Sequence, residues 1–398
     1  MEEIEYMEDI PEGWKCMKVE EFAEVVSGGT PRTDKLEFWN GDIAWITPKD
    51  LSNFKFRYIE RGERNISREG LENSNAKLLP KGTVLLSSRA PVGYLAIAKN
   101  ELSTNQGFQS LIPKENVISE FLYYLLKNNV EYLKSQASGT TFGELSKSTL
   151  KKLTFPLPPL QEQKAIADVL SSIDDKIELL HRQNKTLEEM AMTLFRQWFI
   201  EPTKDGLPDG WEEKKLKDIY VFEKGIEPGS RNYLETPSVD AIRFIRVGDM
   251  LDNKADVYIK KDLAGDSICK FDDLLVSFDG TVGRVSFGLV GCYSSGIRKI
   301  YSKYEIYNKL WLKHQIFISE EVQDEINMHA EGTTILHASS SIDYLSFAFP
   351  PKEKIKEYDK FFDPIYKKIL HNKAQIQTLE KLRDALLPKL MSGEVKII

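Results

Sequence analysis

The chain of 398 residues is poor in the residues and motifs on which most catalytic sites depend. Its three cysteines, Cys16, Cys269 and Cys292, are too scattered for a disulfide framework or a zinc site. Its five histidines show no metal-ligand spacing. The sequence has no GxxxxGK[S/T] phosphate loop, no GxGxxG motif and no GxSxG elbow. We therefore expect no catalytic residues and no bound metal, and binding is the better hypothesis.

Long apolar runs and a signal peptide are also missing. No apolar run approaches the ~20 residues of a membrane span. The N-terminal MEEIEYMEDI is acidic and lacks the basic and apolar regions of a signal peptide. Together with the sparse cysteines, this predicts a cytoplasmic protein with no membrane partner. The formal charge of −7 argues against a free-standing nucleic-acid binder, but it allows a local basic groove or basic partner subunits.

Two stretches, 166–198 and 355–390, carry apolar residues in alternating steps of four and three. This spacing is the a/d seam of a helix that pairs with another helix. Each seam contains one asparagine, Asn184 in the first and Asn372 in the second. If the helices are antiparallel and the asparagines face each other, the pair would fix the helix register at a cost in stability. Periodicity alone leaves two unrelated core helices as the alternative.

The sequence also repeats itself. Six motifs recur in the same order roughly 190–199 residues later, a period far too long for a solenoid. They include PEGW at 11–14 and PDGW at 208–211, VLLSSRAPVG at 84–93 and LLVSFDGTVG at 274–283, and LTFPLPP at 153–159 and LSFAFPP at 345–351. This pattern indicates the tandem duplication of a whole unit, a globular head followed by a Pro-Pro segment and a long helix.

A break is expected within each helical region. Ser171-x-x-Asp174 has the layout of an N-terminal helix cap, so the first long helix is predicted over about 172–200. In the second copy Asp363 and Pro364 occupy the equivalent cap and first helical positions.

The predicted fold is α+β, with two tandem-duplicated globular domains joined by two long helices. The helices are expected to pair as an antiparallel coiled coil with approximate two-fold symmetry. The predicted boundaries are 1–158 for the first head, 159–201 for the first helical region, 202–351 for the second head and 352–398 for the second helical region.

Over nearly its whole length the chain resembles the specificity (S) subunits of type I restriction–modification systems. The resemblance rests on the duplication, on Gly139-Thr140-Thr141 before LPPLQEQKAIA at 157–167, and on TNQGF at 104–108. It implies that each head is a target-recognition domain for one half of a bipartite double-stranded DNA sequence. It implies that the helices space the heads and dock two methyltransferase subunits, which restriction subunits can join. S-adenosylmethionine, ATP and Mg would then be used by those partners, with no cofactor bound by this chain.

The DNA-contacting residues are expected on loops, because Arg, Lys, Asn and Gln best match base edges in the major groove. The alternative for each is a solvated loop charge or a turn-stabilising hydroxyl. In the second head, YSSGI at 293–297 stands where the first has TNQGF, and PPKEK at 350–354 lacks the glutamine of the first copy. The predicted residues are Thr30, Arg32, Lys49, Arg89, Asn105, Gln106, Thr140 and Thr141 in the first head, and Arg231, Arg243, Arg246, Thr281, Arg284, Ser294, Ser295, Arg298, Thr333 and Thr334 in the second.

Two rival functions are left open at this point. One is a coiled-coil scaffold whose heads bind protein partners. The other is a self-sufficient enzyme with an unrecognised site.

Overall fold

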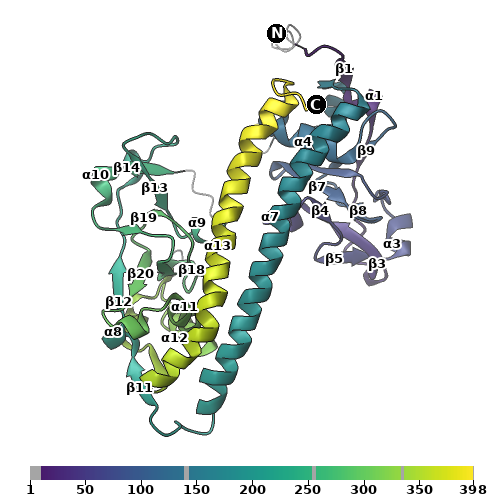
Figure 1. The fold of residues 1–398 in the computed structure, drawn as a ribbon. Helices are drawn as coiled ribbons and strands as arrows, with labels where there is room; N and C mark the ends of the chain where they lie inside the picture. The colour runs from purple at the N-terminus through teal and green to yellow at the C-terminus, as the bar shows by residue number, and fades with distance from the viewer. Residues whose placement is uncertain (1–9, 139–142, 253–256, 333–335, 398) are drawn as a thin grey trace. The chain divides into compact units, whose positions relative to one another are not determined.

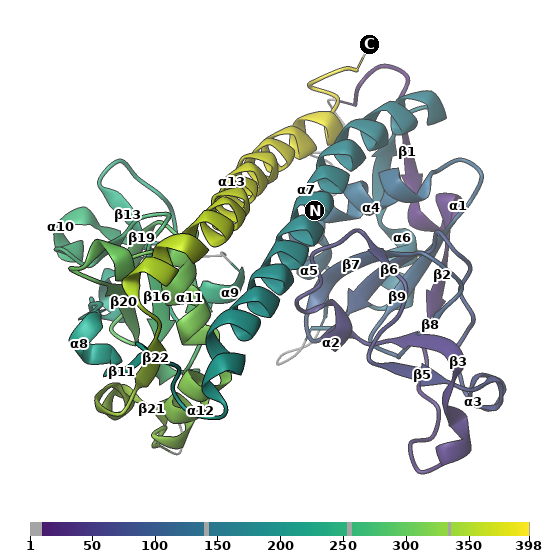
Figure 2. The ribbon, with the colours of Figure 1, turned by 60° about the horizontal axis from the view of Figure 1, so that its bottom comes forward.

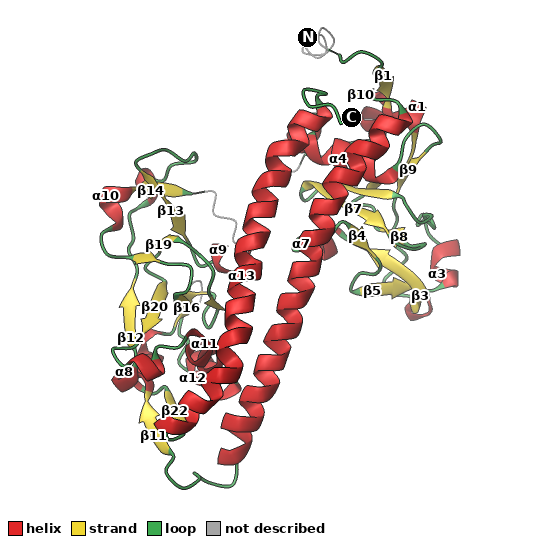
Figure 3. Ribbon diagram, viewed as in Figure 1, coloured by secondary structure: helices red, strands yellow, loops and turns green. Residues whose placement is uncertain are grey.

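The computed structural model describes residues 10–138, 143–252, 257–332 and 336–397. The chain divides into two compact units, Met1–Leu179 with Gln377–Ile398, and Leu180–Ile376. Each unit combines one head with parts of both long helices, and each mixes helices and strands (Figure 3). The predicted α+β class is confirmed.

The first head is built on a five-stranded sheet with the order β2-β9-β6-β7-β4, and a smaller sheet has the order β5-β3-β8. Its strands are β1 (Lys15–Lys18), β2 (Ala23–Ser27), β3 (Trp39–Ile46), β4 (Tyr58–Ile59), β5 (Arg64–Ile66), β6 (Val84–Ser88), β7 (Val92–Ala98), β8 (Ser103–Thr104), β9 (Gln109–Pro113) and β10 (Thr154–Leu157). Its helices are α1 (Val19–Phe22), η1 (Leu36–Phe38), α2 (Pro48–Leu51), α3 (Arg68–Glu72), α4 (Ser119–Asn128), α5 (Val130–Ser135) and α6 (Lys147–Lys152).

The core of the first head lies between this sheet and α4. All five residues of β6 are buried, as expected for a central strand that has no solvent-facing side. Phe121, Leu122 and Leu125 of α4 belong to the same buried cluster as Val84 and Leu86 of β6. Figure 2 shows α4 lying over β6 and β7. Burial of this apolar helix face holds the sheet and α4 together.

The second head repeats this plan with the sheets β12-β20-β16-β18 and β14-β13-β19-β15. Its strands are β11 (Glu212–Lys215), β12 (Val221–Lys224), β13 (Ala241–Ile245), β14 (Tyr258–Lys260), β15 (Ile268–Cys269), β16 (Leu274–Ser277), β17 (Asp279–Gly280), β18 (Val285–Ser286), β19 (Gly291–Tyr293), β20 (Ile297–Tyr301), β21 (Leu336–His337) and β22 (Ser346–Phe349). Its helices are α8 (Leu216–Ile219), η4 (Ser230–Asn232), α9 (Asp249–Asp252), α10 (Lys261–Ala264), η5 (Glu305–Tyr307), α11 (Leu310–Ile318), α12 (Glu320–Met328) and η6 (Ser339–Asp343).

The duplication extends to individual backbone hydrogen bonds. The turn before each anchoring tryptophan closes in the same way, with Trp14 N donating to Pro11 O at 3.1 Å and Trp211 N to Pro208 O at 3.0 Å. Strands β1 and β10 pair antiparallel in the first unit, as β11 and β22 do in the second. The predicted tandem duplication is confirmed.

The two long helices are α7 (Leu160–Phe195) and α13 (Lys352–Met391), shown in teal and yellow in Figure 1. A π-helical turn, η2 (Arg196–Ile200), and a short 3₁₀ turn, η3 (Glu201–Thr203), follow α7. Both long helices are continuous, so the breaks predicted at Ser171 and at Asp363-Pro364 are wrong.

The break was mispredicted because the cap-like residues have other partners. The Asp174 carboxylate does not cap a helix; it accepts hydrogen bonds from Tyr124 Oη at 2.7 Å and from Arg383 Nη1 at 2.9 Å. Pro364 removes one backbone donor from α13, but Phe362 and Tyr366 on either side of it are buried. That burial offsets the lost hydrogen bond.

The helices pair antiparallel within the second unit. Trp198 of the first helical region stacks on Tyr358 with ring centroids 4.8 Å apart, while Asn372 Nδ2 donates to Asn184 Oδ1 at 2.9 Å. Residue numbers therefore rise along one helix as they fall along the other. Both asparagine side chains are buried, and the structure brings them together as the seam spacing predicted. Their role in setting the register stays a prediction.

Candidate nucleic-acid interface

Four loops of the first head meet beyond the ends of the parallel strands β3 and β8. The loop after β2 is tied to the others because Gly29 N donates to Thr104 O at 2.9 Å, and Asn105 N donates to Ile46 O at 3.0 Å. The loop after β6 joins them, since Ser88 N donates to Gly107 O at 2.7 Å. These backbone bonds gather most of the predicted DNA-contacting residues of the first head into one loop cluster.

Glycine is required where these loops touch. A Cβ atom at Gly28 would lie 2.0 Å from Asn105 O, so no larger residue fits without moving the backbone. In the second head Gly225 occupies the same place, 2.3 Å from Ser294 O by the same measure. The close approach of two backbones is therefore a shared feature of both heads.

The polar side chains of the first cluster interact with one another. The exposed Thr30 hydroxyl donates to Gln106 Oε1. Asn105 Oδ1 accepts from Gly107 N at 2.9 Å, which is an Asx-type turn. This bond leaves the Asn105 amide nitrogen available to a ligand, whereas the Gln106 carbonyl is already engaged.

The basic residues of the first cluster are each beside a carboxylate. Lys49 Nζ lies 2.8 Å from Glu63, Arg32 Nη2 lies 2.7 Å from Asp34, and Arg89 Nη1 lies 3.8 Å from Glu144. Hydrogen bonding to Glu63 raises the pKa of Lys49, and Asp34 does the same for the pKa of Arg32. All three pairs are exposed, and such pairs contribute only about 0–1 kcal/mol. The cations can therefore exchange these partners for phosphates or base edges at little cost.

The second head has the same loop cluster. Ser294 N donates to Ile245 O at 2.9 Å, as Asn105 N does to Ile46 O in the first head. Phe278 N donates to Gly296 O at 2.8 Å, as Ser88 N does to Gly107 O. These matching bonds place Ser294 and Ser295 where the first head has Asn105 and Gln106.

Two arginines of the second head, Arg246 and Arg284, are bonded to other groups of the same head. Arg246 is exposed and forms a bidentate pair with the buried Asp249, at 2.9 and 3.1 Å. Arg284 Nη1 donates to Val247 O at 2.9 Å. Arg231 lies exposed on η4, and Arg243 is half-buried on β13. Thr281 is exposed on the loop after β17, and its carbonyl accepts from Ser277 Oγ.

Arg298 and Ser294 are the two buried members of the predicted DNA-contacting set within the described residues, with 6% and 8% of their surfaces exposed. The Arg298 guanidinium donates to Ser295 O at 2.6 Å and to Ser339 Oγ at 2.8 Å, and burial lowers its pKa. A guanidinium held in this way supports the loop from inside. The structure therefore favours a structural role for Arg298 over the predicted DNA contact.

Four of the predicted residues, Thr140, Thr141, Thr333 and Thr334, lie outside the described residues.

The acidic partners were missed by sequence reasoning. Asp249 accepts the Arg246 backbone N–H at 2.9 Å, and Asp50 accepts that of Thr47 at 2.7 Å at the same place in the first head. Asp50 lies within α2, where its carboxylate completes a capping box with Thr47, and Asp249 is the first residue of α9. The signal was available, because Asp50 and Asp249 are matched in the sequence repeat.

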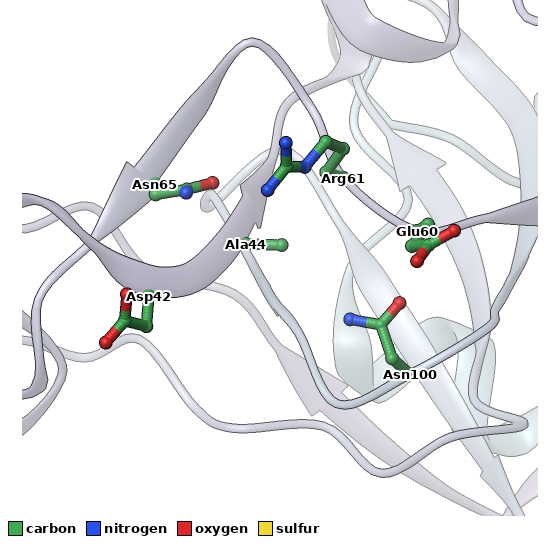
Figure 4. A pocket seen from close by; sticks show the side chains of 6 residues that line it. All are labelled: Asp42, Ala44, Glu60, Arg61, Asn65 and Asn100. Atoms are coloured by element: carbon green, nitrogen blue, oxygen red, sulfur yellow. The ribbon is translucent and has the colours of Figure 1, made fainter.

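A shallow polar pocket of about 390 Å³ lies elsewhere on the first head (Figure 4). Its lining residues are Asp42, Ala44, Glu60, Arg61, Asn65 and Asn100. Among the described residues, no group of three or more His, Cys, Asp or Glu side chains is arranged to hold a metal ion. The helices in the described part of the chain include none that is both long and apolar enough to span a membrane.

Comparison with known proteins gives one consistent answer. The profile of the type I restriction modification DNA specificity domain matches residues 11–189 and 208–381. The type I restriction enzyme MjaIX specificity subunit of Methanocaldococcus jannaschii is 38% identical over 98% of this chain and 95% of its own length. The HindI specificity subunit of Haemophilus influenzae is 25% identical over 89% of this chain and 94% of its own. The crystal structure of an S subunit from M. genitalium has a similar fold, with a TM-score of 0.56 and 17% identity over 96% of both chains.

Proposed function

Because the chain belongs to the family of type I restriction–modification DNA specificity subunits, we propose that its two heads read the two halves of one bipartite DNA target. The observation that supports this most directly is the pair of matched loop clusters. Both are held by the same backbone hydrogen bonds, yet Asn105 and Gln106 in one correspond to Ser294 and Ser295 in the other. A shared scaffold with different polar side chains would read two different half-sites, and so an asymmetric sequence.

The same proposal assigns the chemistry to partner subunits. Two methyltransferase subunits would dock on the helices, and restriction subunits would join them. S-adenosylmethionine, ATP and Mg would be bound by those partners, and this chain would act without a cofactor in the cytoplasm. Exposed apolar side chains on the helices of the second unit, Met190, Met192 and Phe361, would suit such docking.

The deciding experiment is sequencing of host DNA for methyladenine with this gene present, deleted and restored. We expect a split motif to lose methylation on deletion and to regain it on restoration. If methylation is unchanged, the proposal fails and a scaffold that binds proteins becomes the better explanation.

Single substitutions then assign the half-sites. Restoration with Arg89→Ala should relax recognition in one half of the motif, and Arg246→Ala in the other, each by about 1–3 kcal/mol if the side chain reaches a guanine. Arg68→Ala is a control on the same head, because Arg68 is an exposed arginine that also pairs with a carboxylate, that of Glu72 on α3. Equal weakening on all sequences would instead identify a phosphate contact.

A further inference from the structure

The loop clusters of the two heads contain an equivalent side-chain pair with inverted charges. Ser88 and Phe278 are equivalent for two reasons. Their N–H groups donate to the carbonyls of the matching glycines, Gly107 and Gly296. Their own carbonyls accept from the N–H groups of the matching residues Leu145 and Ala338. The residues that follow, Arg89 and Asp279, are therefore also equivalent. So are their partners Glu144 and His337, which directly precede Leu145 and Ala338.

The second pair is the better formed. His337 Nδ1 lies 2.7 Å from Asp279 Oδ1, whereas the closest approach of Arg89 and Glu144 is 3.8 Å. Asp279 and His337 also face each other in the antiparallel β17–β21 pairing. The His337 side chain is 64% exposed and the Asp279 side chain 22%, so the imidazole lies on the solvent side of the pair.

The pair adjoins the predicted DNA-contacting residues of the second head. Asp279 N donates to Gly296 O at 3.2 Å, and Ser294 and Ser295 directly precede that glycine. Thr281 lies two residues beyond Asp279. A ligand that contacts these residues therefore comes close to His337.

The charges around His337 can be counted from the elements packed against it. Asp279 faces it from β17, and the buried Arg298 of β20 attracts Asp279. Glu331 pairs with His337 through the backbone, and its side chain is exposed. Asp343 of η6 is already paired with Lys217 at 2.8 Å.

Protonation therefore changes the charge of the second cluster only. Asp279, Arg298 and neutral His337 sum to zero, and protonated His337 adds one positive charge. In the first head Gln109 is equivalent to Arg298. Gln109 pairs with the last residue of β2, and Arg298 pairs with the last residue of β12. Arg89 and Glu144 cancel each other, and this pair contains no histidine, the ordinary side chain that changes charge between pH 5 and 8.

We infer that the Asp279–His337 pair belongs to the DNA-binding surface of the second head and that His337 takes up a proton when DNA binds. The inference rests on the proposed function. A positive charge beside the phosphates favours binding, so by linkage a protein that takes up a proton on binding loses DNA affinity as the pH rises. Asp279 is the positioning residue, because it holds the imidazole by one nitrogen and leaves the other toward solvent.

The test uses the full chain, co-purified with its methyltransferase, and a duplex that carries the split motif found by methylation sequencing. Between pH 6 and pH 8 we expect the wild-type affinity to fall about tenfold, since one proton changes affinity by at most tenfold per pH unit. The affinity of His337→Gln should be flat over this range. Calorimetry in two buffers of different ionisation enthalpy should show proton uptake by the wild type that His337→Gln lacks.

Two further variants serve as controls. His329→Gln alters an imidazole of the same head that stacks on Tyr344, and it should keep the wild-type pH dependence. Asp279→Arg with His337→Glu installs the pair of the first head, and it should bind without pH dependence.

The inference is overturned if the wild type binds equally at pH 6 and pH 8, or if His337→Gln keeps the dependence. Failure of the wild-type complex to select any duplex at either pH would instead overturn the proposed function.

Discussion

The two units use the same backbone but join head and helices with different chemistry. The Pro-Pro segments at 158–159 and 350–351 align the long helices, which makes Asp174 equivalent to Tyr366, and Arg383 equivalent to Ala191. In the first unit Asp174 contacts Tyr124 and Arg383. In the second unit Tyr366 lies 2.6 Å from His314 Nδ1 and accepts from Gln315 at 2.9 Å.

The first joint is a buried network of charges. Arg57 comes from the head and donates to Tyr124 Oη at 3.1 Å and to Asp175 at 2.7 Å, and its side chain is only 5% exposed. Burial raises the pKa of Asp174. The charges of Lys127 and Arg383 and the hydrogen bond from Tyr124 together lower it by more, so the pKa lies below its usual value. The carboxylate is therefore ionised at neutral pH.

The second joint is mainly aromatic. Trp311 of α11 stacks on Phe362 with centroids 4.4 Å apart, and Phe199 packs edge-on against Trp311 at 6.0 Å. A joint of this kind depends on buried area and ring geometry. The comparison teaches that a duplicated fold tolerates either a charged or an aromatic joint between head and helices.

The largest expected effect comes from breaking the charged joint. Asp174→Ala removes the carboxylate that Tyr124 and Arg383 share and leaves the half-buried Arg383 guanidinium with only the exposed Asp384, so it should destabilise the first unit by about 3 kcal/mol. Hydrogen exchange of α4 amides against those of α11 reports on each unit separately. The second unit should keep its protection.

Two further variants test whether the charged joint is the more sensitive of the two. Asp174→Ala with Arg383→Ala should cost less than the sum of the single changes, because the guanidinium that loses Asp174 is removed with it. Tyr366→Phe is the matched change in the second unit and should cost only about 1–2 kcal/mol, since it removes neutral hydrogen bonds. Equal losses for Asp174→Ala and Tyr366→Phe would contradict the contrast between the joints.

A smaller effect should make the stability of the two units depend differently on pH. Burial, together with the charge of Lys373, lowers the pKa of His314 to about 3. Because the folded pKa lies below that of an unfolded histidine, about 6.5, the unfolded state binds more protons at intermediate pH. The second unit should therefore be fully stable above pH 6.5 and lose about 2 kcal/mol by pH 5. Asp174 stays ionised in this range, so the first joint should hold until more acidic pH.

Hydrogen exchange at pH 7 and pH 5, corrected for intrinsic rates, measures this difference. His314→Gln should remove the selective weakening of α11, whatever its effect at neutral pH. A parallel loss of protection in α4 and α11 would exclude His314 as the cause.

The smallest effect concerns the tryptophan that anchors each head. Trp14 Nε1 donates to Glu162 at 3.1 Å, whereas Trp211 Nε1 is buried with no acceptor among the described residues. Lys354 stands at the position equivalent to Glu162. Lys354→Glu should therefore stabilise the second unit by about 0.5–1.5 kcal/mol in denaturant unfolding. Lys354→Gln tests whether an acceptor without charge is enough, and a loss of stability with both variants would show that Trp211 needs no partner.

Much of the fold could be predicted from the sequence because the duplication and the seam are long-range patterns. The seam stretch 166–198 lies within α7 and η2, and the seam stretch 355–390 lies within α13. Apolar periodicity reports which face is buried, and that face survives small errors at the element ends.

The break at Ser171 shows the limit of such patterns. A cap signature is local. It cannot reveal that the Asp174 carboxylate accepts hydrogen bonds from Tyr124 and Arg383, which are distant in sequence. The same limit applies to the interface. The sequence indicated which loops carry polar residues, but the burial of Arg298 and the carboxylate beside Lys49 depend on tertiary contacts.

The close approach of backbones at Gly28 and Gly225 has a consequence for the evolvability of these loops. Because main-chain bonds hold the loops together, the side chains of the exposed Gln106 and the half-buried Ser295 carry little of the folding energy. Such positions can be randomised as a library with the fold intact, and new half-site preferences can be selected from it one head at a time. The glycines are the residues that such a library must leave unchanged.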